Sequence, residues 1–255
     1  LALLPLSHVY ERYWSYYVLY RGAVNVYIRD PQAVMSVLHD VRPTVMCAVP
    51  RVYEKAYNII HGKADSANPV RRQLFYWAKG VGLKALEVKR SGESLGLWLG
   101  LQFKLADKLL FSTLRQRFGG RVRFLPVGGA RLADEINLFF NAAGLNIKCG
   151  YGLTETTAPC AFNPLGTPFH AGSVGVAFPG FSLRIAEDGE IQVKGRAVFP
   201  RYHKNDEATE LSFTEDGWYA TGDLGRIDND GFLYITGRKK DLIITAGGKN
   251  VSPGP

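Results

Sequence analysis

Three short segments of the sequence combine glycine with side chains that suit nucleotides and metal ions. The first runs from Gly150 to Glu155 and follows an apolar stretch that ends at Cys149. Because ligands of α/β sheets bind beyond the carboxyl ends of the strands, Tyr151 could stack there on a flat base. The oxygens of Thr154 and Glu155 suit phosphate and Mg²⁺. Taken alone, the segment is explained equally well by a glycine turn with capping threonines.

The other two segments each place a charged residue directly after a glycine. One is Thr221-Gly222-Asp223, whose carboxylate could accept two hydrogen bonds from a ribose diol, although a turn aspartate is the common alternative. The other is Gly237-Arg238-Lys239-Lys240-Asp241, in which Arg238 could lie over ribose or phosphate and Lys240-Asp241 could be a pivot. A solvated linker is the alternative for the last segment, so neither segment decides a function by itself.

Strands that alternate with helices must position the first segment. Apolar and β-branched stretches predict strands at 23–28, 44–49, 123–127 and 146–149. Helical patterns cover most of 30–38, 52–118 and 133–143, including one partly amphipathic helix over 94–111. Such alternation is typical of parallel βαβ units. We therefore expect an α/β subdomain with a parallel sheet over residues 1–160.

After residue 160, glycines and prolines punctuate short β segments. Strands are predicted at 183–185, 190–193 and 231–235, and Asp188-Gly189 and Asp230-Gly231 are typical of hairpin turns. We expect a small antiparallel, β-barrel-like subdomain over 161–237. The remaining residues, 238–255, are expected to form a hinge and the start of a truncated C-terminal domain.

The composition excludes several classes of protein. Of the 255 residues, 46% are hydrophobic and 21% are charged, as in globular proteins and unlike disordered ones. The longest apolar stretch, 95–101, is far shorter than the ~20 residues that span a bilayer. Three cysteines without a CxxC pair support neither a zinc site nor a disulfide framework. We therefore expect a cytoplasmic protein.

The positive charge lies in the first half of the chain. Residues 1–128 contain 19 Lys and Arg against 8 Asp and Glu. Solvated helix faces are the favoured explanation. An anionic membrane surface comes second, on the inner face of a membrane, because Trp98 and Phe103 lie near Lys104 and Lys108. Nucleic acid is not an expected partner, since neither an aromatic–basic RNA motif nor a helix-turn-helix pattern is visible.

Together and in this order, the three segments resemble those of the AMP-forming acyl-CoA synthetases, in the adenylate-forming superfamily. The resemblance covers essentially the whole chain, and residues 4–11 are similar to the family's Pro-Leu-x-His-x-x-Glu segment. The long-chain branch in particular is resembled at 43–55, 105–109, 117–120 and 247–251. The resemblance implies a long-chain fatty-acid–CoA ligase with part of the adenylate-forming fold. Its substrates would be a long-chain fatty acid, ATP and CoA, and Mg²⁺ would be its cofactor.

The resemblance also implies a role for each matched residue. The nucleotide would be bound by Gly128, Gly129, Ala130, Gly150, Tyr151, Gly152, Thr154, Asp223 and Arg238. The first three of these would form the wall between the adenine and the acyl chain. Glu155 would ligate Mg²⁺, His8 would lie near the fatty carboxylate, and Lys240 would be the rotation hinge. The catalytic set is therefore expected to be His8, Thr154, Glu155 and Lys240, and the loop that admits the CoA arm would contain Gly247 and Gly248.

Two catalytic parts of the family have no counterpart in residues 1–255: the Ser/Thr/Gly-rich phosphate loop and the C-terminal catalytic lysine. We therefore expect the chain to be the central segment of a longer synthetase that does not adenylate by itself. Two alternatives stay open at this point. One is a fatty acyl-AMP ligase that loads a carrier protein, and the other is a non-catalytic nucleotide-binding fragment.

Overall fold

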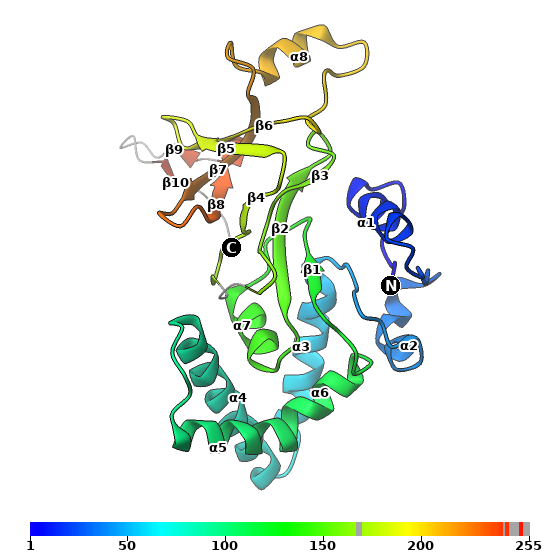
Figure 1. The fold of residues 1–255 in the computed structure, drawn as a ribbon, viewed down its shortest axis with the longest axis vertical. Coiled ribbons are helices and arrows are strands. Elements are labelled where there is room, and N and C mark those ends of the chain that lie inside the picture. Colours follow the sequence, from blue (N-terminus) through cyan, green and yellow to red (C-terminus); the bar gives the residue numbers. More distant parts are fainter. Residues whose placement is uncertain (167–169, 242, 245–249, 252–255) are drawn as a thin grey trace. The chain divides into compact units, whose positions relative to one another are not determined.

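The computed structural model of the chain describes residues 1–166, 170–241, 243–244 and 250–251 (Figure 1). Contacts divide the chain into two compact units, with the division between Cys149 and Gly150. The first unit contains Leu1–Cys149 together with Leu165–Ala171, and the second unit contains the other residues. The domain boundary that we expected near residue 160 is later in the sequence than this division. The expected ranges 1–160, 161–237 and 238–255 stay predictions.

Helices make up most of the first unit. They are α1 (Val9–Tyr20), the short 3₁₀ turn η1 (Pro31–Ala33), α2 (Val34–Val41), α3 (Pro50–Asp65), α4 (Pro69–Arg90), α5 (Leu97–Ala106), the π-helical turn η2 (Asp107–Phe111), α6 (Ser112–Arg117) and α7 (Asp134–Ala142). Within the described part of the chain, no helix combines the length and the apolar character that crossing a membrane requires.

A parallel βαβ unit forms the centre of the first unit, as predicted. Strand β1 (Leu125–Val127) leads through α7 to β2 (Ile147–Leu153), and the two strands pair in parallel over Leu125–Val127 and Ile147–Cys149. The first turn of α7 carries Asp134 and Glu135, which the positive end of the helix dipole favours.

Two of the predicted strands do not form continuous strands. Residues 44–49 run parallel beside β1, but they contribute only isolated bridges, from Val45 to Phe124 and from Ala48 to Val127. Residues 23–28 contribute one bridge, between Tyr27 and Ala2. Local β-branched composition indicates extended backbone, whereas continuous pairing also requires a neighbouring strand along the whole length.

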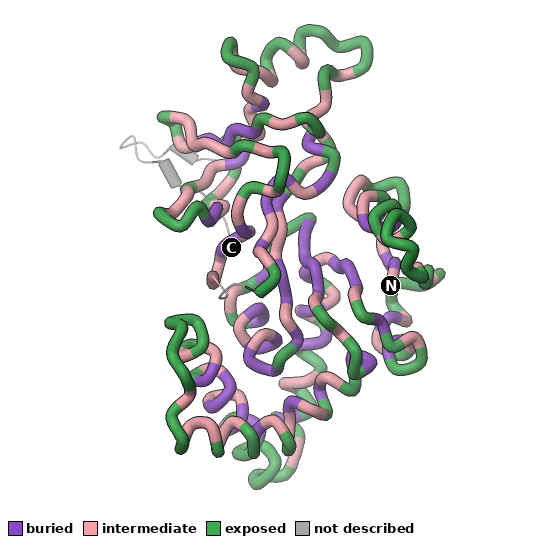
Figure 2. Tube along the Cα trace, in the orientation of Figure 1, coloured by how far each residue is buried: buried purple, intermediate pink, exposed green. Residues whose placement is uncertain are grey.

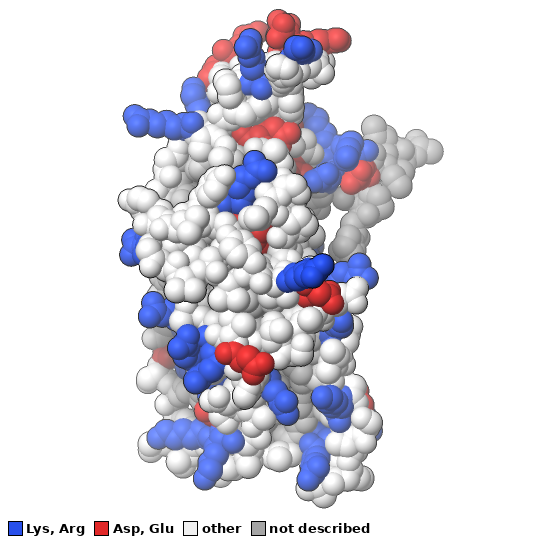
Figure 3. Space-filling view, turned by 90° about the vertical axis from the view of Figure 1, so that its right-hand side faces the viewer, with Lys and Arg blue, Asp and Glu red and all other residues white. Residues whose placement is uncertain are grey.

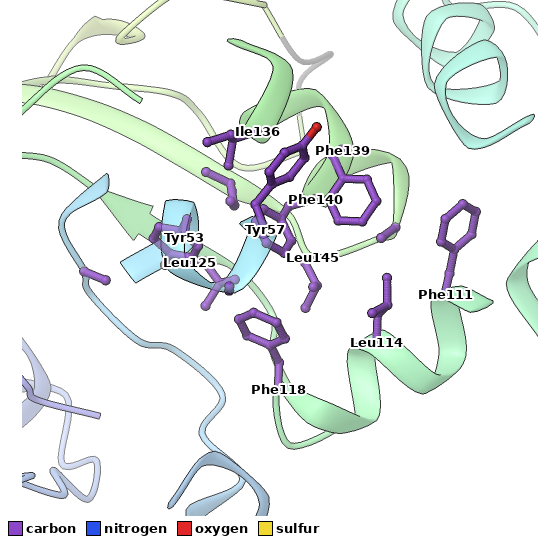
Figure 4. Close-up of a cluster of buried hydrophobic side chains, with 14 of the residues drawn as sticks. Tyr53, Tyr57, Phe111, Leu114, Phe118, Leu125, Ile136, Phe139, Phe140 and Leu145 are labelled. Atoms are coloured by element: carbon purple, nitrogen blue, oxygen red, sulfur yellow. The ribbon is translucent and has the colours of Figure 1, made fainter. Parts of the chain in front are cut away.

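The core of the first unit is a cluster of aliphatic and aromatic side chains between the helices and the sheet (Figure 4). Figure 2 shows that the buried positions follow β1, β2 and α7. The largest fully buried side chains of this core include Tyr53, Phe111, Phe118, Phe139 and Phe140. Several of the rings meet edge to face, and Phe139 and Phe140 lie 5.2 Å apart between centroids. Such pairs are worth about 0.5–1.5 kcal/mol beyond the area they bury.

The predicted helix over 94–111 is interrupted by the π turn η2. Asp107 begins this turn, and both of its carboxylate oxygens accept hydrogen bonds from the guanidinium of Arg115, at 2.7 and 2.9 Å. Arg115 also donates to the backbone carbonyl of Ala143, at 2.9 Å. The turn places Phe111 in the core against α4, where Gly82 leaves room for its ring.

The second unit is built on antiparallel strands. The later residues of β2 pair with β3 (Ala158–Phe162), which pairs with β4 (Val176–Ala177). A separate four-stranded sheet has the order β5-β6-β7-β8 and contains β5 (Phe181–Ile185), β6 (Glu190–Gly195), β7 (Tyr219–Ile227) and β8 (Leu233–Arg238). The remaining elements are α8 (Asp206–Ser212), the 3₁₀ turn η3 (Lys239–Asp241), β9 (Ile243–Ile244) and β10 (Asn250–Val251).

The predicted hairpin turns are confirmed. The turn at Asp188-Gly189 joins β5 to β6, and the turn at Asp230-Gly231 joins β7 to β8. In each turn the glycine has a positive φ, which is the reason for the Asp-Gly pair. The predicted fold class, an α/β unit followed by an antiparallel β unit, is therefore confirmed.

Two glycines of α4 provide a test of the packing against η2. A Cβ added at Gly82 would lie 2.6 Å from Cζ of Phe111, whereas a Cβ at Gly80 would meet nothing within 4 Å. Alanine gains about 1 kcal/mol over glycine in a helix, and overpacking a core costs about 1–3 kcal/mol. We expect Gly80→Ala to raise the free energy of unfolding and Gly82→Ala to lower it. Chemical denaturation of both variants checks this, and equal stabilisation by the two would contradict the tight contact.

Candidate active site

The pairing of β7 with β8 brings two of the predicted site residues together. Asp223 and Arg238 are direct cross-strand partners, and Nε of Arg238 lies 3.1 Å from Oδ1 of Asp223. The Asp223 side chain is 7% exposed and that of Arg238 is 52% exposed. The ion pair therefore joins a buried carboxylate to a guanidinium that still reaches solvent.

Tyr151, on β2, contacts the other oxygen of the Asp223 carboxylate. Its hydroxyl donates a hydrogen bond of 2.7 Å to Oδ2 of Asp223. Burial raises the pKa of the Tyr151 hydroxyl, and the negative charge of Asp223 raises it further, so the hydroxyl stays a donor. This contact was not predicted. A carboxylate has about four lone-pair positions, so Asp223 keeps acceptor capacity for a diol.

The turn after β2 is fixed by several hydrogen bonds. The hydroxyl of Thr156 accepts from the amide of Leu153, at 2.9 Å, and donates to the carbonyl of Ala158. Both Thr157 and Ala158 have a positive φ, of 55° and 83°. Such conformations cost non-glycine residues about 1–3 kcal/mol each and persist where the surroundings impose them. Here the hydroxyl of Thr157 also donates to the carbonyl of Ala197, at 2.7 Å.

This turn carries Thr154 and Glu155, the two residues predicted to face phosphate and metal. Thr154 is exposed and Glu155 is half-buried. The hydroxyl of Tyr202 donates to Oε1 of Glu155, at 2.9 Å, and the amide of Phe199 donates to the Glu155 carbonyl, at 2.7 Å. Tyr202 is therefore a residue of the site that the sequence did not predict.

Gly150 and Gly152 are required by a neighbouring strand. A Cβ at Gly150 would lie 2.8 Å from the ring of Phe162, and a Cβ at Gly152 would overlap the carbonyl of Ala158. The close approach of β3 thus explains both glycines, and their predicted contact with a nucleotide stays a prediction.

The remaining predicted residues lie in the first unit or near the end of the chain. His8 is the N-cap of α1, and its Nδ1 accepts from the amide of Tyr10, at 3.2 Å. Gly128, Gly129 and Ala130 follow β1, the last two being exposed. Lys240 is exposed in η3, and Gly247 and Gly248 lie outside the described residues.

Glu155 suits a magnesium ion only where phosphate oxygens complete the coordination. Among the described residues, no group of three or more His, Cys, Asp or Glu side chains could hold a metal ion unaided. Mg²⁺ commonly takes one or two protein carboxylates together with substrate phosphates. Glu155 offers such a carboxylate at a turn whose neighbour Thr154 is exposed.

Comparison with known proteins decides the family. Residues 1–203 match the family described as AMP-binding enzyme. The chain belongs to this family. Among curated relatives of the chain, the long-chain-fatty-acid–CoA ligase FadD15 of Mycobacterium bovis is 41% identical over 253 residues. That alignment covers 99% of this chain and 41% of the relative. The long-chain-fatty-acid–CoA ligase ACSBG1 of Rattus norvegicus is 34% identical, with 100% and 36% covered. The chain thus spans about two fifths of the length of these relatives.

Solved structures of adenylate-forming enzymes share the fold. ATP-bound MatB from Rhodopseudomonas palustris matches with a TM-score of 0.68 and 26% identity, over 99% of this chain and 42% of MatB. O-succinylbenzoate coenzyme A synthetase from Bacillus subtilis, in complex with ATP and magnesium ion, matches with a TM-score of 0.67 and 23% identity, over 99% and 44%. The predicted adenylate-forming fold is therefore confirmed.

The Tyr151–Asp223 hydrogen bond can be tested by removing one oxygen atom. Tyr151→Phe keeps the ring but leaves a buried carboxylate oxygen without its donor. We expect the free energy of unfolding to fall by about 1.5–3 kcal/mol, as for hydrogen bonds to charged groups. Tyr76→Phe is the matched control, because its hydroxyl donates to the exposed carboxylate of Asp65 at the same distance, 2.7 Å. Denaturant titration should show a much smaller loss for the control, and equal losses would mean that burial adds nothing to the Tyr151 contact.

Proposed function

We propose that the chain is part of a long-chain fatty-acid–CoA ligase and supplies much of its nucleotide site. The observation that carries the proposal is the buried Asp223 carboxylate. Tyr151 of β2 and Arg238 of β8 hold this carboxylate in place. The names of the relatives support the choice of a fatty acid as substrate. Because the chain covers two fifths of those relatives, the whole reaction is assigned to the full-length protein.

In the first half of the reaction, the fatty carboxylate attacks the α-phosphorus of ATP. A new C–O–P linkage forms, the bond to the bridging oxygen breaks, and pyrophosphate leaves, giving an acyl-adenylate. Asp223 would accept the ribose hydroxyls and Arg238 would lie over the ribose. Tyr151 would lie near the adenine and keep Asp223 oriented, with Gly150 and Gly152 in the same segment. Gly128, Gly129 and Ala130 would separate the base from the acyl chain, and His8 would stand near the carboxylate.

The phosphates would lie at Thr154 and Glu155. Mg²⁺, when bound, neutralises charge on the phosphate oxygens and so favours attack and departure. Glu155 would hold the ion through its carboxylate while Tyr202 fixes the orientation of that carboxylate. Thr154 would donate its hydroxyl proton to a phosphate oxygen.

In the second half, the CoA thiol would attack the acyl carbon and displace AMP, forming the thioester. Rotation at Lys240 would exchange the two reactive faces, and the loop with Gly247 and Gly248 would admit the CoA arm. Alternation of this kind allows one site to serve two chemical steps in turn.

Glu155→Gln in the full-length protein tests the magnesium role. The amide keeps the shape and the contact with Tyr202 but lacks the negative charge that binds the ion. We expect fatty-acid-dependent exchange of pyrophosphate into ATP to fall about 100-fold, because loss of even a residue that only hydrogen-bonds to a metal ligand costs about 10–100-fold. Glu187→Gln, at an exposed acid in the β5–β6 turn, is the control. Exchange at the wild-type rate in the Glu155 variant would refute the role.

The acyl acceptor distinguishes this proposal from its alternatives. A ligase that loads a carrier protein would form the adenylate but no thioester with free CoA. A non-catalytic nucleotide-binding fragment would be stabilised by ATP without turnover. Mass spectrometry of the products with and without CoA separates the three cases, and acyl-CoA is the product we expect.

We further propose a cytoplasmic protein with a peripheral contact to the inner face of a membrane through α5. Exposed apolar side chains follow one face of this helix at helical spacing, among them Leu97 at 91%, Trp98 at 73% and Leu101 at 59%. Lys104 and Lys108 flank them. An exposed apolar stripe with Trp beside Lys is typical of helices at an anionic lipid surface. Elsewhere the basic side chains are scattered over the face drawn in Figure 3, which favours solvation over a nucleic-acid track.

Trp98→Ala tests this contact. Withdrawing a large apolar side chain from the interface costs about 1.5–3 kcal/mol, so we expect binding of the full-length protein to phosphatidylglycerol-containing vesicles to weaken about tenfold or more. Leu211→Ala is the control, because Leu211 is 79% exposed on α8. Sedimentation with anionic and with purely phosphatidylcholine vesicles measures the effect. Equal binding by wild type and the Trp98 variant would contradict the contact.

A further inference from the structure

Glu190 is a buried carboxylate that joins two segments of the candidate active site. It is the first residue of β6, and its side chain is 9% exposed. Its Oε1 accepts a hydrogen bond of 2.7 Å from the amide of Gly222, and its Oε2 accepts one of 3.0 Å from the ammonium of Lys239. One carboxylate therefore bridges β7 and the residue that follows β8.

The two partners of Glu190 are the sequence neighbours of the Asp223–Arg238 ion pair. Gly222 directly precedes Asp223 on β7, and Lys239 directly follows Arg238 at the end of β8. Asp223 and Arg238 are cross-strand partners. Glu190 therefore contacts the residue next to each member of this pair.

The contact to Gly222 holds the strand backbone directly before Asp223. Gly222 has a φ of +72°, a conformation that favours glycine. On the same strand, the Thr221 hydroxyl donates to the carbonyl of Ile191, at 2.7 Å, and accepts from the amide of Asp223. Rotation of the peptide between Thr221 and Gly222 would break the hydrogen bond from the Gly222 amide to Glu190. It would also shift the Asp223 carboxylate, which follows directly. Binding geometry that depends on one carboxylate is sensitive to shifts of about 1 Å.

Lys239 has a second carboxylate partner that provides an internal comparison. Its ammonium lies 2.7 Å from Oδ2 of Asp188, a shorter contact than the one to Glu190. The Asp188 side chain is 50% exposed, however, and solvent screens ion pairs of that kind so that they contribute little. Glu190 is largely removed from solvent, so its charge acts on Lys239 with little screening.

We propose that Glu190 is a positioning residue for the nucleotide, which holds Asp223 through Gly222 and Arg238 through Lys239. The proposal rests on the proposed function, because the ligand it serves is the ribose of that reaction. It also links the ribose carboxylate to η3, so that movement of the segment after Arg238 is felt at Asp223. Glu190 touches no substrate itself.

A double-mutant cycle on the full-length protein tests the proposal. Glu190→Gln keeps the shape but lacks the charge that binds Lys239, and Lys239→Met lacks the ammonium. We expect each change to raise the Kd for AMP about tenfold, the size of one charge-assisted hydrogen bond. The double variant should bind AMP about as weakly as either single variant, because both changes break the same contact. Isothermal titration with AMP measures all four affinities.

Asp188→Asn is the matched control, since it removes the other carboxylate at Lys239. We expect less than about a twofold change in Kd. A purely structural role for Glu190 would lower the melting temperature while leaving the Kd for AMP and the coupling unchanged, and that result would overturn the proposal. Tenfold weakening by Asp188→Asn would likewise overturn it.

Amide hydrogen exchange separates failure of this proposal from failure of the proposed function. Glu190→Ala removes the acceptor of the Gly222 amide, so we expect that amide to exchange about tenfold faster. If wild-type protein binds no AMP, the proposed function fails, and the nucleotide role of Glu190 fails with it even when exchange at Gly222 accelerates. If wild type binds AMP and exchange at Gly222 is unaltered, the positioning contact alone is refuted.

Discussion

The second unit depends on the burial of the Asp223 carboxylate. A charge removed from water costs several kcal/mol unless partners compensate it, and this carboxylate has a hydroxyl on one oxygen and a guanidinium on the other. The contacts join three different strands, since Asp223 lies on β7 and its two partners, Tyr151 and Arg238, lie on β2 and β8. The relation of β2 to the four-stranded sheet is therefore fixed by electrostatics as well as by apolar packing. The same arrangement leaves the carboxylate with unused lone pairs in a defined direction.

The turn between β2 and β3 shows how strain is maintained beside this carboxylate. Two consecutive non-glycine residues, Thr157 and Ala158, adopt a positive φ. The surrounding bonds, from Thr156 inside the turn and from Phe199 and Tyr202 outside it, outweigh that cost. A turn held in this way cannot relax into a regular hairpin. Within this turn, Thr154 is exposed and Glu155 is half-buried.

Much of this arrangement follows from local sequence, and the rest does not. Asp-Gly pairs specify their turns through the positive φ of glycine, and the acidic first turn of α7 indicates where that helix begins. The bonds from Tyr202 to Glu155 and from Lys239 to Glu190 join residues 47 and 49 positions apart. No periodicity or turn rule relates such positions, because their contact arises only when the strands pair. The sequence also does not show that β3 approaches Gly150 and Gly152. We therefore assigned these glycines to a ligand, although the approach of β3 already excludes a side chain at both positions.

The contacts around η3 favour placing the proposed hinge at Lys240 rather than one residue earlier. Lys239 is tied to Asp188 and Glu190, and its pKa is raised by those two carboxylates. Its backbone position is thereby coupled to the β-sheet through a largely buried acid. Lys240 is exposed and follows immediately. A rotation needs a residue whose dihedral angles can change without breaking buried charged contacts. Rotation at Lys239 would separate an ammonium from a desolvated carboxylate, whereas rotation at Lys240 preserves that contact and with it the geometry of Asp223.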